Sequence, residues 1–391
     1  MFQINRREML RASGAAVACS VVGLHRKALG AAAATVGEPT VISYNEHLYH
    51  GWPTVARRSN GDLLLVYSGG REAHVCPFGR VELMRSYDGG ESWTWPEVVM
   101  DGPIDDRDAG VLETSKGSIL ITTFTSLAYV PQLERAEKVE AGQSGAWAAE
   151  RLARWQAAHR RVGAEERQAA LSEWMIRSTD GGVTFSGRYH CEVSSPHGPT
   201  QLSDGRLLYA GKDLWHGEQR VGVCESNDDG QTWHWLATIP ARDGDDFRQY
   251  HELHAVEAAD GRIIAQIRNH NKANAGETLQ SESEDGGKTW ATPHPIGVWG
   301  LPSHLLRLRD DRLLMTYGYR RQPFGNQARI STDHGRTWSE PLVISDDGPG
   351  GDLGYPSTVQ LDDGSLVTIW YEVVKDIPKA VLRQAKWTLG G

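Results

Sequence analysis

The sequence predicts an all-β fold, a six-bladed β-propeller, because two different repeats run through it out of phase. The first repeat is an octapeptide of the form S-x-D-x-G-x-x-W, in which Phe185 once replaces the Trp. Its Asp can accept backbone N–H groups, its Gly can take a positive φ, and its aromatic residue can pack beneath the turn. Each copy therefore predicts a hairpin turn. The five copies begin at Ser86, Ser178, Ser226, Ser283 and Ser331.

The second repeat predicts the inner strands of the blades. Each copy has a polar start, an alternating strand, a turn resembling Asp-Gly, and then an apolar strand of the kind that is buried on both faces. The six copies span residues 50–69, 106–125, 195–212, 250–269, 301–320 and 354–372. No octapeptide follows the sixth copy, so we expect the early segment 40–47 to join the last blade and close the ring.

Residues 1–34 resemble an export signal rather than part of the fold. The pair Arg6 and Arg7 precedes a modest apolar run and then small residues up to Ala34. The apolar run is too short to span a bilayer as a helix. The pattern predicts a twin-arginine-type signal, with residues 35–391 forming one propeller domain in the periplasm or outside the cell.

Residues 131–176 interrupt the repeat pattern, because they lie between the inner strands of the second blade and that blade's octapeptide. The segment is rich in Ala, Glu, Arg and Gln, and it places Trp147, Leu152 and Trp155 at helix-like intervals. These features predict a helical insertion. We expect it to pack on the propeller rim, with a lid over the site or a subunit interface as alternatives. The oligomeric state stays open.

Composition excludes several classes of partner. With 39% hydrophobic residues, a mean hydropathy of −0.46 and a formal net charge of −9, the protein should be soluble and should repel nucleic acids and anionic membranes. Histidine is abundant, but His251 and His254 are three residues apart on a predicted strand and would face opposite sides of it. No catalytic metal and no other cofactor is expected.

The first residues of the inner strands are predicted to meet at the central channel, because each blade of a propeller points its innermost strand at the axis. The inner segments supply His50, Trp52, Asp106, Arg107, Asp108, His197, His251, Glu252, His254, His304 and Tyr355. Loops between strands add Arg71, Glu72, His74 and Arg268. This convergence of titratable groups predicts a concave polar site that can do chemistry.

The octapeptides resemble the Asp boxes of the sialidase superfamily, whose members are six-bladed propellers, and the resemblance covers nearly all of residues 40–385. "GYPSTVQLDDGSLVTIWYE" resembles the family segment that carries a tyrosine nucleophile, which implies this role for Tyr355. The same resemblance implies that Glu372 supports an arginine. "HELHAVEAADGRIIAQIRN" is similar to the segment carrying the glutamate that activates the tyrosine. It implies Glu252 for that role and Arg268 as one of three arginines that hold the substrate.

The implied chemistry is coherent. A phenol with a pKa near 10 is a poor nucleophile unless a carboxylate takes its proton. A neutral nucleophile also avoids repulsion when the anomeric carbon of the substrate bears a carboxylate. The superfamily pattern therefore favours an acidic sugar as the substrate.

Three positions depart from the family pattern. The first arginine is replaced by "GWP", Gly51–Pro53, and the third by Gly325. The arginines near the third position are Arg320, Arg321 and Arg329. The place of the acid/base aspartate, twelve residues before Ser86, is held by His74, whereas Arg71 matches the family loop. Histidine can transfer protons near neutral pH as well as an aspartate can.

The resemblance implies an exported, exo-acting glycoside hydrolase that cleaves a terminal acidic sugar from a glycan, with Tyr355, Glu252 and His74 as catalytic residues. A polysaccharide lyase acting on a uronate is an alternative, in which His74 or His251 abstracts the α proton and Tyr355 protonates the leaving oxygen. A non-catalytic carbohydrate-binding propeller is another. The predicted substrate-binding residues are Arg268, Arg71, Glu372, Arg107, Asp106, His50, Trp52, His197, His251, His304 and Arg320. The identity of the sugar and its linkage stay open.

Overall fold

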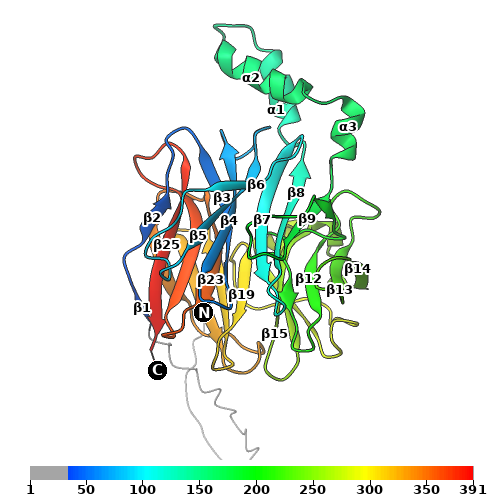
Figure 1. The fold of residues 1–391 in the computed structure, drawn as a ribbon, viewed down its shortest axis with the longest axis vertical. Coiled ribbons are helices and arrows are strands. Elements are labelled where there is room, and N and C mark those ends of the chain that lie inside the picture. The colour runs from blue at the N-terminus through cyan, green and yellow to red at the C-terminus, as the bar shows by residue number, and fades with distance from the viewer. Residues whose placement is uncertain (1–33, 391) are drawn as a thin grey trace, which may run out of the picture. The chain divides into compact units, whose positions relative to one another are not determined.

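The computed structural model describes residues 34–390, which form six antiparallel sheets arranged as the blades of a propeller (Figure 1). Five blades have four strands in a single antiparallel path, and the sixth is completed by strands from both ends of the described chain. The predicted all-β, six-bladed fold is confirmed. Of the predicted export signal, residues 1–33 lie outside the described residues, and Ala34 already begins the first strand.

The first three blades follow the chain in order. Blade 1 consists of β3 (Tyr49–Arg57), β4 (Leu63–Arg71), β5 (Arg80–Ser86) and β6 (Glu97–Met100). Blade 2 consists of β7 (Asp105–Glu113), β8 (Ile119–Ser126), β9 (Glu173–Ser178) and β10 (Tyr189–His190). Blade 3 consists of β11 (Thr200–Gln201), β12 (Leu207–Lys212), β13 (Val221–Ser226) and β14 (His234–Thr238).

The last three blades complete the ring. Blade 4 consists of β15 (Tyr250–Glu257), β16 (Ile263–Asn269), β17 (Thr278–Ser283) and β18 (His294–Pro295). Blade 5 consists of β19 (Ser303–Arg307), β20 (Leu313–Tyr319), β21 (Phe324–Ser331) and β22 (Leu342–Gly348). Blade 6 consists of β23 (Leu353–Gln360), β24 (Leu366–Val373) and β25 (Ala380–Leu389), with β1 (Ala34–Val36) and β2 (Thr40–Ser43) both paired to β25. This pairing closes the ring as predicted for segment 40–47. Two short 3₁₀ helices, Phe247–Gln249 and Lys272–Asn274, lie near β15 and β16.

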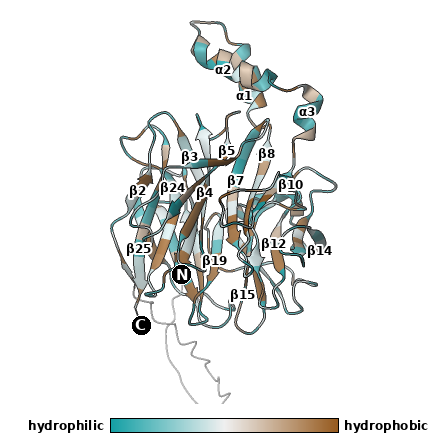
Figure 2. Cartoon of the chain, in the orientation of Figure 1, coloured by the Kyte–Doolittle hydropathy of each residue, from teal (hydrophilic) through white to brown (hydrophobic). Residues whose placement is uncertain are grey.

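Apolar second strands build the core between the blades. In β4 every residue from Leu63 to Tyr67 is fully buried, and Figure 2 shows hydrophobic residues concentrated along the strands of the blades rather than in the connecting loops. Burying a Leu or Val side chain contributes about 1.5–3 kcal/mol each. The packing of neighbouring sheets therefore supplies most of the stability and sets the inner strands around the axis.

The octapeptides form the turns that the sequence predicts. In the first copy, Ser86 Oγ donates to Asp88 Oδ1 at 2.8 Å, and the backbone N–H of Ser92 donates to the same carboxylate at 2.9 Å. The hydroxyl of Ser92 also donates to this carboxylate at 2.5 Å, and it contributes most to the set of hydrogen bonds that lowers the pKa of Asp88 to about 2. Trp93 then reaches the last blade, where its Nε1 donates to Gln384 Oε1 at 3.0 Å. The turn thus serves the contact between blades as well as the hairpin.

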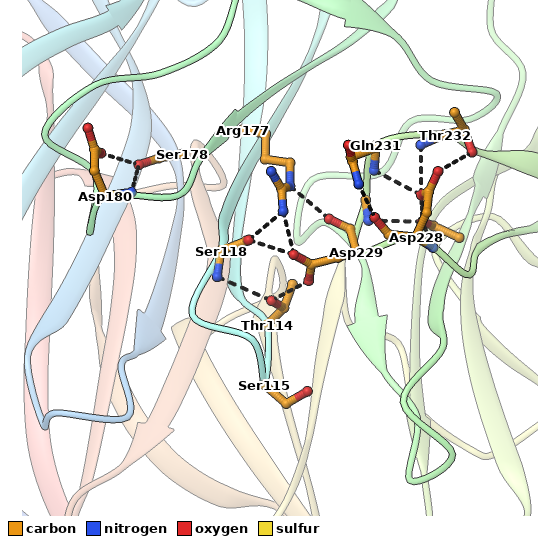
Figure 3. Close-up of polar contacts among 12 residues, drawn as sticks. Thr114, Ser115, Ser118, Arg177, Ser178, Asp180, Asp228, Asp229, Gln231 and Thr232 are labelled. Carbon is orange, nitrogen blue, oxygen red and sulfur yellow. Dashed lines mark hydrogen bonds and ion pairs between the residues drawn. The ribbon is translucent and has the colours of Figure 1, made fainter.

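A polar cluster at the third octapeptide joins blades 2 and 3 (Figure 3). Asp229 takes a position with φ of +66° and points its carboxylate toward blade 2. Arg177 Nη2 contacts Asp229 Oδ2 at 2.5 Å, and the hydroxyls of Thr114 and Ser118 each donate to this carboxylate at 2.6 Å. Because every oxygen of the carboxylate is bonded, the cluster holds the two blades at a fixed separation.

The helical insertion is confirmed as α1 (Val130–Glu137), α2 (Ala149–Arg160) and α3 (Ala164–Ala169), beyond the end of β8 (Figure 1). Its predicted end at residue 176 is wrong by a few residues, because Glu173 already begins β9. None of the helices in the described part of the chain is long and apolar enough to cross a membrane.

The insertion packs against one loop of blade 1. Trp155 is fully buried in a cluster with Cys76, Tyr129 and Leu133. Arg154 Nη2 donates to Glu72 Oε2 at 2.6 Å, and Arg151 pairs with the other oxygen of that carboxylate. The helices therefore brace the loop between β4 and β5, which also carries His74.

Candidate active site

Four inner strands carry the same backbone irregularity at the end that faces the axis. In β3, β7, β15 and β23 the ladder register shifts so that two residues of the inner strand lie opposite one residue of the next strand, which defines a β-bulge. The first residue of each bulge has a positive φ although it is not Gly. These residues are Trp52, Asp108, Glu252 and Tyr355, with φ of +54°, +45°, +47° and +53°. Such backbone costs about 1–3 kcal/mol per residue and concentrates at functional sites.

Tyr355, Glu252 and Arg268 form one hydrogen-bonded group across the axis. Tyr355, on blade 6, donates its phenolic proton to Glu252 Oε1, on blade 4. Arg268, on the strand next to Glu252, donates from Nη1 to Glu252 Oε2 at 2.5 Å and to Tyr355 Oη at 3.2 Å. The structure therefore brings together three residues for which the resemblance implies a nucleophile, its base and a substrate-holding arginine.

The electrostatics of this group match those roles. Burial alone would raise the pKa of Glu252, but Arg268 and the hydrogen bond from Tyr355 bring it below its usual value. Burial, followed by the charges of Glu252 and Asp108, raises the pKa of Tyr355 well above 10. At neutral pH Glu252 is an acceptor and Tyr355 still holds its proton, which is the starting state for base-assisted attack.

Asp108 and Arg320 complete the surroundings of the phenol. Burial raises the pKa of Asp108 to about 7. The negative charge of Glu252 adds to this rise, and the positive charge of Arg107 offsets only part of it. Arg320 lies with its guanidinium carbon 5.9 Å from the centre of the Tyr355 ring. It is anchored by a hydrogen bond of 2.9 Å from Nε to the Leu353 carbonyl.

His74 lies beside this group, on the loop braced by the insertion. Its Nδ1 is 2.9 Å from Tyr49 Oη and 3.2 Å from Asp352 Oδ1, and Tyr371 donates to the same carboxylate oxygen at 3.1 Å. The His74 ring stands edge-on to Trp52 with 4.9 Å between ring centres. Nδ1 is thus held by neighbours, while the side chain is 46% exposed and Nε2 is left for another partner. This arrangement suits proton transfer.

Trp52 neighbours both His74 and Tyr355. It is 1% exposed, and its ring centre lies 6.4 Å from that of Tyr355. The guanidinium carbons of Arg71 and Arg107 lie 4.8 and 4.7 Å from the centre of the Trp52 ring. These cation–π contacts fix the indole next to Gly51, which stands where the family pattern has its first arginine.

Comparison with protein families gives one match, to the BNR repeat-like domain, over residues 150–368, which is more than half of the chain. The chain belongs to the BNR repeat-like domain family. No curated protein matches the sequence significantly.

Solved structures similar to this BNR repeat-like protein share its fold. A protein of unknown function from Dyadobacter fermentans gives a TM-score of 0.73 at 24% identity, covering 91% of this chain and 99% of that chain. The NanB sialidase from Streptococcus pneumoniae gives a TM-score of 0.62 at 14% identity, covering 90% of this chain and 70% of that chain. The intramolecular trans-sialidase from Ruminococcus gnavus gives a TM-score of 0.59 at 13% identity, covering 87% of this chain and 94% of that chain. The resemblance to the sialidase superfamily is confirmed for family and fold.

Several predicted binding residues of this BNR repeat-like protein are buried in internal pairs. Arg71 is fully buried and bidentate to Asp105, at 2.6 and 2.9 Å. Asp106 is fully buried and accepts the Gly102 N–H at 2.5 Å. Glu372 is fully buried and accepts from Arg383 Nη1 at 2.8 Å. In this structure the three side chains support the protein rather than a ligand. Glu372 does hold an arginine, as the resemblance implies, but that arginine is Arg383.

The predicted histidines divide between three places. His50 lies away from the axis against Ser43 and Tyr67. His197 and His304 lie in the channel with His254, lining a cavity of about 310 Å³ whose other walls include Glu113 and Arg309. Burial lowers the pKa of all three channel histidines. They are neutral packing groups, and their Nδ1 atoms contact Thr54, Leu305 and Thr358.

His251 remains beside the site. Its ring centre is 4.6 Å from that of His270, and burial with the nearby charge of Lys212 lowers its pKa to about 4. The group that could hold a metal among the described residues, Glu173 with His190 and His216, lies outside this site.

Two features of the site were not predicted. Asp108 was placed near the axis but given no role, although its position in the second repeat corresponds to those of Glu252 and Tyr355, and that alignment is the signal that could have found it. Asp352 lies in a loop without a motif.

The family arginine replaced by Gly325 has no room here, since a Cβ would lie 1.8 Å from the Ser345 carbonyl.

Proposed function

We propose that the protein is an exo-acting glycoside hydrolase that removes a terminal acidic sugar from a glycan. The observation that carries this proposal is the hydrogen-bonded group of Tyr355, Glu252 and Arg268. A buried tyrosine whose proton is directed at a carboxylate is an activated nucleophile. The export signal predicted at residues 1–34 agrees with an extracellular or periplasmic glycan as the substrate.

In the proposed first step Tyr355 Oη attacks the anomeric carbon while Glu252 takes the phenolic proton. His74 donates a proton from Nε2 to the glycosidic oxygen, so that the C–O bond breaks and the aglycone leaves as an alcohol. In the second step His74 removes a proton from water, the resulting hydroxide attacks the anomeric carbon, and Tyr355 recovers its proton from Glu252. The sequence of two displacements retains the anomeric configuration.

The acidic character of the sugar rests on two guanidinium groups beside the phenol. Arg268 uses Nη1 for Glu252 and Tyr355, and Arg320 uses Nε and Nη2 for Leu353 and Tyr371. We propose that the groups left over, Arg268 Nη2 and Arg320 Nη1, bind a carboxylate on or next to the anomeric carbon. Charge-assisted hydrogen bonds of this kind contribute about 1.5–3 kcal/mol each.

A panel of aryl glycosides of sialic and uronic acids tests the proposal. The wild type should release the aryl alcohol from at least one substrate, and Tyr355→Phe should lose at least about a thousandfold in kcat. Tyr317→Phe is a matched control, because this tyrosine is equally buried but lies in blade 5 with Gln327 as its partner. A fluorinated substrate analogue should add its glycosyl mass to the peptide that contains Tyr355. Hydrolysis that survives Tyr355→Phe would contradict the proposal.

The role of His74 has its own test. Aryl leaving groups of low pKa need little protonation, so His74→Ala should retain most activity toward them and lose it toward a sugar leaving group. Equal losses on both kinds of substrate would remove His74 from the acid/base role.

A uronate lyase is a second candidate, favoured by the low pKa of His251. A histidine that is neutral at pH 7 beside Arg268 could abstract the proton α to a carboxylate. The ultraviolet absorbance of an unsaturated product distinguishes this reaction from hydrolysis, which yields only a new reducing end.

A further inference from the structure

A glutamate and two histidines lie together on the outer strands of blade 2 and the adjoining loop of blade 3. Glu173 begins β9, His190 ends β10, and His216 lies in the loop that follows β12. One ligand atom from each residue lies within 4.8 Å of the others. Among the described residues, this is the one group of three or more His, Cys, Asp or Glu side chains whose ligand atoms lie this close together.

The carboxylate of Glu173 is incompletely satisfied. The residue is 1% exposed, and Oε1 accepts the N–H of Leu214 at 2.6 Å. Oε2 is buried and has no hydrogen-bond partner, and His216 Nε2 lies 3.9 Å from it. An orphaned carboxylate oxygen in the interior is costly, so its retention points to a group that is bound there.

The two imidazoles are arranged as metal ligands usually are. His190 Nδ1 is 2.8 Å from Ser172 Oγ, which leaves Nε2 as the ring nitrogen for an ion. A ligating histidine commonly bonds a neighbour through its other ring nitrogen, and this bond fixes the ring orientation. The rings of His190 and His216 are 5.2 Å apart and nearly perpendicular, at 84°. Both rings are exposed at their outer edges, so an ion can enter from solvent.

We propose that Glu173, His190 and His216 bind a divalent transition-metal ion, and Zn²⁺ in particular, with water at the fourth position. Two imidazoles and one carboxylate form a ligand set that suits zinc, whereas calcium and magnesium prefer oxygen ligands throughout. Ligand atoms on tetrahedral zinc, with bonds of about 2.0–2.1 Å, lie roughly 3.4 Å apart. Binding would therefore require the exposed loop that carries His216 to shift toward Glu173 and His190.

Charges around the cluster are consistent with a bound cation. Two further acidic residues lie near the ligands: Asp213 is close to both Glu173 and His190, and Glu192 is close to His190. A dication would balance Glu173 and use both histidines in their neutral form.

A metal ion bound at this site would connect two parts of the structure. Glu173 follows α3 closely in the chain, and Asp213 Oδ1 accepts the N–H of His216 within the blade 3 loop. A metal ion at this site would tie the base of the helical insertion to that loop. Because the site lies outside the group around Tyr355, its occupancy can be tested without any glycan substrate.

Zinc titration of the full chain after treatment with chelator tests the proposal. Calorimetry should show one equivalent of Zn²⁺ bound, and Co²⁺ should produce the visible absorption of a low-coordinate site. His216→Ala, in an exposed loop, should weaken zinc binding by more than about 100-fold, since even the loss of a supporting hydrogen bond costs about 10–100-fold. Ser172→Ala, which removes the hydrogen bond to His190 Nδ1, should weaken zinc binding by about 10–100-fold.

His294→Ala is the matched control, because His294 is also exposed and pairs with Glu282 at 2.9 Å but has no second histidine. The His294→Ala substitution should leave the stoichiometry and affinity of zinc binding unchanged. The melting temperature of the wild type should rise with zinc, and that of His216→Ala should not. Binding that is unaffected by His216→Ala, or reduced equally by His294→Ala, would overturn the assignment.

Discussion

The role of Arg71 can be decided by measuring stability and activity in the same variants. The resemblance predicts a substrate-binding arginine, whereas the structure shows a fully buried guanidinium that is bidentate to the fully buried Asp105. Arg71 also donates to the carbonyl of His74 at 3.1 Å. Removing one partner of a buried ion pair leaves an uncompensated charge and costs about 3–5 kcal/mol. Arg71→Ala should therefore lower the free energy of unfolding by this amount, measured by urea denaturation with tryptophan fluorescence.

The control is Arg312→Ala, which breaks a half-exposed pair with Asp310 at 2.7 Å and should cost no more than about 1 kcal/mol. A double variant that replaces both Arg71 and Asp105 by apolar residues should recover part of the loss, because no lone charge remains. If Arg71→Ala instead unfolds like the wild type and loses only substrate affinity, the structural reading of this arginine is refuted.

Three further predictions follow from buried groups. The pKa of Asp106 is raised from 3.8 to about 7 by burial, so the folded state holds its proton to higher pH, and stability should fall as the pH rises from about 4 to about 7. Asp106→Asn should flatten this part of a pH series of urea midpoints. Trp155→Ala removes the centre of the insertion's apolar cluster and should cost about 3–5 kcal/mol there, seen as protease cleavage between α1 and α2 before the blades are cut. Asp108→Asn should remove an inflection near pH 7 from the profile of kcat/KM, because the carboxyl that titrates there is lost.

The fold was readable from the sequence because its turns and inner strands repeat. Each octapeptide carries its own hydrogen-bond donors and acceptors, so in the turn at Ser86 the hydrogen bonds to Asp88 come from residues of the same octapeptide. The end of the insertion was harder to place. Residues 171–176 continue the polar and aromatic composition of the helices, and only the pairing of β9 with β8 makes Glu173 the start of a strand.

The site was readable only in part, since a motif locates a strand but not the direction of each side chain. Tyr355, Glu252 and Arg268 were placed together because the resemblance covered their segments. Asp106 lies two residues before Asp108 on β7, yet its carboxylate binds the backbone of Gly102. Asp352 meets His74 only in the folded protein, because 278 positions separate them in the chain. No local pattern encodes such a contact.

The bulges explain why this end of the propeller carries the site. A regular inner strand would alternate its side chains between the two faces of its sheet. An inserted residue at positive φ breaks that alternation at the strand's start, and in four blades it does so at the same place, at Trp52, Asp108, Glu252 and Tyr355. The repeat therefore supplies four equivalent positions at the axis, and the sequence fills them with an indole, two carboxyl groups and a phenol. Backbone strain at each position is offset by the buried strands behind it, such as β4 and β24, and at Trp52 and Tyr355 the bulge side chain itself packs into the same apolar cluster as those strands.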